Sequence, residues 1–122
     1  MTNIQDFRQL YRRKVTALSD GSSKIRLTLD RVDHGILRVL THVTVENQDS
    51  AYTKCRLGIA HGKVDHYIDE LENPAAGELA VSRSDILLME SDRLFAELTG
   101  TTSGDLMIMI CIGWEMDMRR KA

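Results

Sequence analysis

The feature that most constrains the fold is a long apolar run near the end of the chain, residues 104–118. At a strand's period of two residues, its side chains divide into two rows. One row holds the more rigid side chains, Leu106, Ile108, Ile110, Ile112 and Trp114, and the other holds Met107, Met109 and Cys111. A buried helix is the alternative for so short a run, but the isoleucines, Gly113 and the preceding turn residues favour a strand. Because both rows are apolar, we predict a central strand that is covered on both faces.

We expect the two rows of this strand to lie in different environments. Rigid side chains pack best where rotamers are fixed, so we expect the Leu106 to Trp114 row to fill the space between two sheets. Methionine suits a surface that adapts to a partner, so we expect Met107, Met109 and Cys111 to lie at a subunit contact around a symmetry axis. The rival interpretation is that the amino-terminal arm of the same chain covers this second row.

Length and charge limit the class of protein. A chain of 122 residues can bury one core without disulfides or metals, so a single domain is expected. The 16 basic and 18 acidic residues give a net charge of -2, which does not favour nucleic acid or acidic lipid as a general partner. The two cysteines fit no metal or redox spacing, and there is no secretory or membrane-spanning run. We therefore expect a reduced, soluble protein made in the cytoplasm of a cell.

The amino-terminal part, residues 1–11, is predicted to be an arm outside the sheet, possibly containing a short helix. A longer helix reaching Leu18 can also be drawn, but alternation after Arg12 and the Asp20-Gly21 turn favour a hairpin over residues 12–30. A lone domain would expose the arm's apolar side chains at no benefit. We therefore expect the arm to pack on a neighbouring subunit or shell protein through Ile4, Phe7 and Leu10.

Short alternating segments separated by turn residues fill the rest of the chain. The predicted strands are residues 24–30, 36–46, 52–59, 64–71, 78–81, 86–89 and 93–98. The charged segment 64–71 is expected at a sheet edge, and residues 72–77 form a loop. This spacing predicts an all-β, antiparallel β-sandwich of jelly-roll type in a single domain, residues 12–118, followed by a basic tail, residues 119–122.

Candidate catalytic and metal-binding groups are few. The four histidines, His34, His42, His61 and His66, lack the spacing of a cupin metal site, and His61 and His66 would face opposite sides of one strand. Acidic pairs such as Asp65/Asp69 and Glu90/Asp92 fall in edge strands and turns, where solvated charge is expected. Both Cys55 and Cys111 are expected to act as small core residues, and no phosphate-binding glycine loop is present. We therefore expect no enzyme activity, no metal and no cofactor.

The only dense basic cluster is formed by Arg8, Arg12, Arg13 and Lys14. It could contact DNA or an acidic patch on a neighbouring protein. A solvated basic segment is the equally simple alternative.

The order of turns and strands also resembles a known family. Residues 41–50 (THVTVENQDS), a charged strand, residues 73–77 (NPAAG), residues 85–100 and residues 102–106 look like the small jelly-roll virion proteins of tailed bacteriophages. The likeness covers residues 12–116. It implies a virion protein without enzyme activity, of the capsid decoration (cement) type that stabilises the head.

The resemblance also implies partners. They would be further copies of the chain, with a trimer favoured, and a major capsid or neighbouring virion protein. The alternatives are a head–tail junction or tail accessory protein and, from another class, a carbohydrate- or receptor-binding β-sandwich module.

Overall fold

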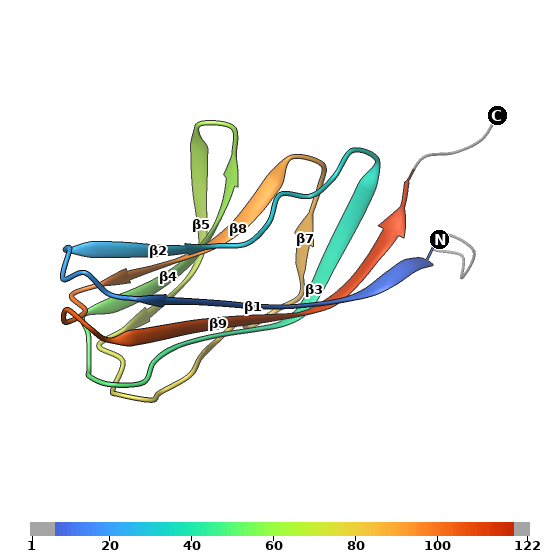
Figure 1. Ribbon diagram of the computed structural model, residues 1–122. Coiled ribbons are helices and arrows are strands. Elements are labelled where there is room, and N and C mark those ends of the chain that lie inside the picture. Colours follow the sequence, from blue (N-terminus) through green and yellow to red (C-terminus); the bar gives the residue numbers. More distant parts are fainter. Residues whose placement is uncertain (1–6, 119–122) are drawn as a thin grey trace.

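Extended strands account for most of the described chain, as the alternating pattern predicts. The structure is a computed structural model that describes residues 7–118, and within that range it contains nine strands and no helix (Figure 1). They are β1 (Phe7–Leu18), β2 (Lys24–Thr28), β3 (Ile36–Asn47), β4 (Lys54–His61), β5 (Val64–Glu72), β6 (Ala80–Val81), β7 (Ile86–Leu88), β8 (Asp92–Thr99) and β9 (Leu106–Asp117).

The strands form two antiparallel sheets that pack face to face as a sandwich, which confirms the predicted fold class. The larger sheet has the order β1-β9-β3-β6, with β7 also paired to β3. The smaller sheet has the order β2-β8-β4-β5. The last long strand, β9, is therefore central, and the charged strand β5 lies at an edge, both as predicted.

The first strand corrects the prediction for the amino-terminal part. It pairs with β9 from Phe7↔Met116 to Leu18↔Leu106, whereas β2 pairs with β8 in the other sheet. Residues 12–30 are therefore not a hairpin, because the Asp20-Gly21 turn carries the chain from one sheet to the other. Residues 7–11 are strand and neither arm nor helix, since β9 is long enough to pair with all of β1. Residues 1–6, with Ile4, and the tail 119–122 lie outside the described residues.

The two rows of β9 face the opposite way from the prediction. Met107, Met109 and Cys111 are fully buried between the sheets, so their assignment to a subunit contact is wrong. The neighbouring strands decide the orientation. Most neighbours of the methionine row are apolar, Val15 and Ala17 on β1 and Val43 and Val45 on β3, with Arg13 and Asn47 as the polar exceptions. The isoleucine row lies beside Arg12, Lys14, His42 and Glu46, which require water.

A β-bulge in β3 reverses the alternation of inward and outward side chains along this strand. The register with β9 shifts between Leu40 and His42, so the two halves of the strand present opposite alternation. Strict alternation would place Leu37, Val39, Val43 and Val45 on one face, whereas the bulge puts Val43 and Val45 in the core and leaves Leu37 and Val39 on the other face. Opposite the bulge lies Gly113, where a Cβ atom would be 1.8 Å from the Val39 carbonyl oxygen. Only glycine allows the two backbones to approach this closely.

Candidate functional site

The side of the larger sheet that faces away from the sandwich carries apolar side chains, and we call it the apolar outer face. The register places Leu10, Trp114, Val39 and Leu87 in one row across β1, β9, β3 and β7. The same face continues along β9 through Ile112, Ile110, Ile108 and Leu106, and ends beside Leu18. Leu10 is 81% exposed, Leu18 69%, Leu87 60% and Ile112 41%, whereas Leu106, Ile110 and Trp114 are half-buried and Val39 and Ile108 are buried.

Charged residues flank this face differently on its two sides. On β1, Arg12 and Lys14 lie beside Ile112 and Ile110, and neither has an ion-pair partner among residues 7–118. On β3, Glu46 lies beside Ile108. The face is therefore an apolar centre with a basic border on one side and an acidic residue on the other.

Such a surface is unusual for a protein that works alone. Single apolar side chains are common at surfaces, but contiguous apolar patches mark contact sites or aggregation-prone regions. In addition, β1 is the end strand of its sheet, and at 12 residues it is long for an unpaired edge. Both features make this face a candidate contact surface.

The predicted basic cluster is divided by the strand. Alternation sends Arg12 and Lys14 to the apolar outer face, whereas Arg13 points the other way, with its guanidinium 4.7 Å from the Tyr11 ring centre and 3.7 Å from Asp30. The backbone of Arg8 belongs to β1, as does that of Phe7, but their side chains lie outside the described residues. The described members therefore do not form one basic patch.

A buried polar network that the sequence analysis missed lies at one end of the sandwich. Arg38 donates from Nε to Glu115 at 2.8 Å and from Nη2 to Asp30 at 3.0 Å, and its guanidinium stacks 4.0 Å from the Tyr11 ring centre. The Tyr11 hydroxyl also donates to Asp30, and the Gln9 amide donates to Glu115 at 2.6 Å. The β3 bulge sends Arg38 inward, so strict alternation could not reveal this network.

The pKa shifts of Tyr11 and Asp30 indicate a structural role for this network. Burial, followed by the hydrogen bond to Asp30, raises the pKa of Tyr11 well above its usual value. Burial works to raise the pKa of Asp30 as well, but the Tyr11 hydrogen bond and the charge of Arg38 outweigh it and lower that pKa. The network therefore holds a carboxylate and a phenol in the protonation states they already have at neutral pH.

The outward side of the smaller sheet is built differently, and we call it the polar outer face. Phe95 lies across Gly58, where a Cβ atom would be 2.4 Å from the ring. Arg26 covers that ring at 3.8 Å from its centre, and Tyr67 meets it edge-on at 5.6 Å. Glu97 accepts hydrogen bonds from Arg26 and Tyr67. The Phe95 ring is thus covered by side chains of its own chain.

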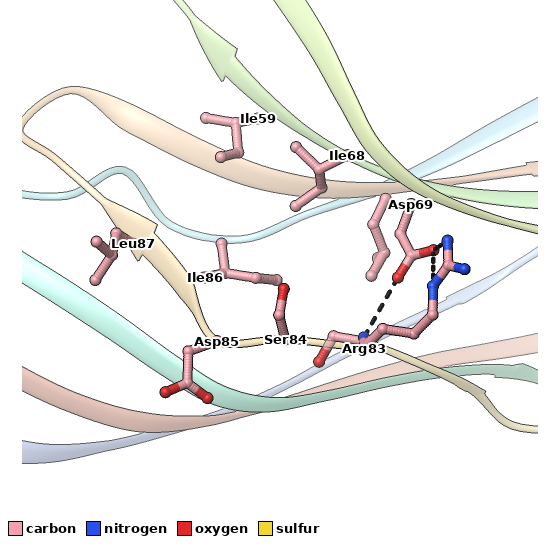
Figure 2. A pocket seen from close by; sticks show the side chains of 10 residues that line it. Ile59, Ile68, Asp69, Arg83, Ser84, Asp85, Ile86 and Leu87 are labelled. Atoms are coloured by element: carbon pink, nitrogen blue, oxygen red, sulfur yellow. Dashed lines mark hydrogen bonds and ion pairs between the residues drawn. The ribbon is translucent and has the colours of Figure 1, made fainter.

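Two hollows lie at the open side of the sandwich, between β5 and the segment from β6 to β7. Each has a volume of about 210 Å³, below the usual range for small-molecule sites. Arg83 lines both and reaches across to Asp69, to which its Nε donates at 3.0 Å (Figure 2). Asp69 lies on β5 of the smaller sheet and Arg83 lies between β6 and β7 of the larger sheet, so this ion pair links the two sheets at their open side (Figure 2).

The remaining candidate groups of the sequence analysis occupy separate places. His34 pairs with Glu90 at 2.6 Å and His61 with Asp92 at 2.8 Å, whereas His42 and His66 are exposed. Among residues 7–118, no three potential metal ligands come together.

The acidic candidates are paired as well. Asp69 accepts from Arg83, which lowers its pKa, and the Gly35 backbone N–H followed by His34 lowers the pKa of Glu90. A general acid would need the opposite shift. Burial raises the pKa of Cys55 to about 11 and that of Cys111 to about 12, which keeps both thiols protonated and inert at neutral pH.

Comparisons with known proteins do not place the chain in a family. No sequence family and no curated protein matches it. Similar solved structures include the core of Drosophila NLP, which is 18% identical, with 89% of this chain and 99% of that chain covered and a TM-score of 0.44. The phage PRD1 vertex protein P5 is 11% identical over 87% of this chain and 95% of that chain, with a TM-score of 0.48.

A carbohydrate-binding module of family 29 is a third structure of this kind. It is 10% identical, with 90% of this chain and 76% of that chain covered and a TM-score of 0.45. At such identities these likenesses concern the β-sandwich fold alone. Within residues 7–118 the structure also has no helix that could cross a membrane.

Proposed function

We propose that the chain is a non-enzymatic structural protein of a phage virion, of the capsid decoration type, that assembles through its apolar outer face. The observation that carries the proposal is the unpaired apolar surface over β1, β9 and β3, bordered by an unpaired edge strand. Burying such a surface against another protein is favourable by about 25 cal/mol for each Å² of apolar area. The resemblance of residues 12–116 to small virion proteins supports a phage particle as the setting.

The charges on the apolar outer face favour a second copy of the chain as one partner. When two copies pack face to face about a two-fold axis parallel to β9, β1 of each copy lies over β3 of the other. Arg12 and Lys14 of one copy then approach the side that carries Glu46 of its partner. A two-fold axis perpendicular to the strands would instead bring the basic borders together, which repels. A dimer formed this way would differ in mass from the trimer that the resemblance favours.

The virion role is tested by binding to phage particles. Purified protein is mixed with expanded, empty heads of a tailed phage that lack their own decoration protein, and the heads are then sedimented. We expect saturable co-sedimentation and heads that resist heating better than undecorated ones. Protein that remains in the supernatant at saturating concentrations would contradict the virion role, whereas the self-association would still be measurable without heads.

Carbohydrate binding has less support from this structure. Modules that bind sugars use exposed aromatic rings, but Tyr11, Tyr52 and Phe95 are buried, Trp114 is half-buried on the apolar outer face, and Tyr67 is 44% exposed with its hydroxyl bound to Glu97. Retention on immobilised polysaccharides, with loss of retention in Tyr67→Ala, would favour this alternative over the virion role.

A further inference from the structure

A third and larger hollow lies on the polar outer face, at the end of the smaller sheet formed by the β4–β5 turn and the β7–β8 turn. Its volume is about 620 Å³, against about 210 Å³ for each hollow at the open side of the sandwich. That volume is within the usual range for small-molecule sites. Three separate segments supply its arginines, with Arg26 on β2, Arg31 in the loop after β2 and Arg93 on β8. We call this the arginine hollow.

The positive charge of the arginine hollow is not fully compensated. Arg26 donates to Asp65 at 3.1 Å and to Glu97 at 3.2 Å, so its guanidinium is held in place and neutralised. By contrast, the guanidinium groups of Arg31 and Arg93 find no acceptor among residues 7–118. Of the acids nearby, Asp65 is occupied by Arg26 and Asp92 by His61 and the Met89 backbone N–H.

The remaining lining suits an anion with several oxygen atoms. Thr28 and Ser91 add hydroxyl groups that can donate, and no other described group is bonded to their side chains. In the register, Ala60 lies between Arg93 of β8 and Asp65 of β5, so a single methyl group separates the two longer side chains. The small side chain leaves the floor of the hollow open.

We propose that the arginine hollow binds the phosphate groups of a small phosphorylated ligand, with Arg31 and Arg93 as its principal donors and Arg26 as a fixed third. The forked guanidinium group matches phosphate oxygens in pairs, which makes arginine the preferred residue for this class of ligand. This binding does not depend on assembly, because the hollow lies on the other sheet from the apolar outer face.

The test uses inorganic tripolyphosphate as the probe, in calorimetric titrations at low and physiological salt. Two variants address the site. Arg31→Gln with Arg93→Gln removes the free donors, and Ala60→Leu fills the floor without changing charge. The matched control is Lys24→Gln with Lys54→Gln, which removes the same charge from the other end of the smaller sheet, outside both the hollow and the apolar outer face. Thermal unfolding of each variant confirms that it is folded.

We expect one saturable site per chain in the wild-type protein, weakened at least tenfold in both site variants and less than twofold in the control. Equal weakening by the control would show general charge attraction and overturn the proposal, as would the absence of saturable binding. Citrate and a short single-stranded oligonucleotide serve as competing probes. Citrate that binds as tightly as tripolyphosphate would overturn the assignment to phosphate, and an oligonucleotide that alone binds would overturn the assignment to a small ligand.

Discussion

The two outer faces of the sandwich differ in whether the chain itself covers their apolar side chains. On the smaller sheet, Phe95 is covered by Arg26 and Tyr67, and these two side chains are both bonded to Glu97, although Arg31 and Arg93 in the arginine hollow have no partner among the described residues. On the larger sheet, Ile112, Leu10 and their neighbours have no such cover, and the adjacent basic residues have no partners among the described residues. The chain itself covers the aromatic ring of one face and leaves the apolar side chains of the other exposed, and exposed apolar patches are typical of contact sites.

The largest expected loss of stability distinguishes the inward row of β9 from its outward row. Met109 is fully buried between the sheets, so Met109→Asp places an unpaired charge in the core and should cost more than about 4 kcal/mol of stability. Chemical denaturation of Met109→Asp and of Ile110→Asp, its outward neighbour, measures the difference. Equal losses in the two variants would mean that the larger sheet is buried on both faces within one chain.

The next largest difference in stability is expected between substitutions in the buried network around Arg38 and substitutions on the polar outer face. Arg38→Met leaves Glu115 buried without its cation, which should cost about 3 to 5 kcal/mol. Arg26→Met breaks a more exposed network in which Lys24 and Tyr67 remain near Glu97, and should cost about 1 kcal/mol or less. Both are measured by urea unfolding. A loss for Arg26→Met as large as that for Arg38→Met would show that the polar outer face is part of the core.

A glycine substitution tests the packing of the polar outer face. In Gly58→Ala the new methyl group would meet the Phe95 ring and the His66 carbonyl oxygen, which should destabilise the protein by about 1 to 3 kcal/mol. Adding Phe95→Leu should restore part of the loss, because the two changes share one contact. The oligomeric state should not change in either variant. No rescue in the double variant would place the strain at the His66 backbone instead.

Thiol reactivity distinguishes the two rows without disturbing the fold. Burial, only partly offset by the charge of Arg38, raises the pKa of Cys111 to about 12, so its labelling at neutral pH should be slow. The thiol introduced by Ile112→Cys faces outward and should react quickly in dilute protein and more slowly as concentration rises and the face is covered. Mass spectrometry over time gives both rates. Equally slow labelling of both positions at every concentration would contradict the orientation of β9.

Much of the fold could be predicted from alternation and turn residues. The sandwich class, the central position of β9 and the edge position of β5 were all evident from the sequence. Which row of β9 faces inward could not be predicted, because both rows are apolar. The side chains of β1 and β3 settle it, and their pairing with β9 is a long-range property.

The candidate site was harder to predict than the fold. The β3 bulge reverses alternation at Leu40 and sends Arg38 into the core, and a pattern with a strict period of two cannot show this. Of the predicted contact residues, Leu10 does lie on the apolar outer face, and its role there stays a prediction. The arginine hollow gathers residues from distant segments that only the folded sheets bring together.

The most direct test of the account is the mass of the protein in solution, measured by analytical ultracentrifugation for two single substitutions to glutamate. Ile112→Glu places a charge at the centre of the apolar outer face, and Val64→Glu places the same charge on the exposed edge strand β5. We expect the wild-type protein and Val64→Glu to be oligomers of equal mass, and Ile112→Glu to be a folded monomer of nearly unchanged stability. A monomeric wild-type protein, or an Ile112→Glu oligomer of wild-type mass, would contradict assembly through this face.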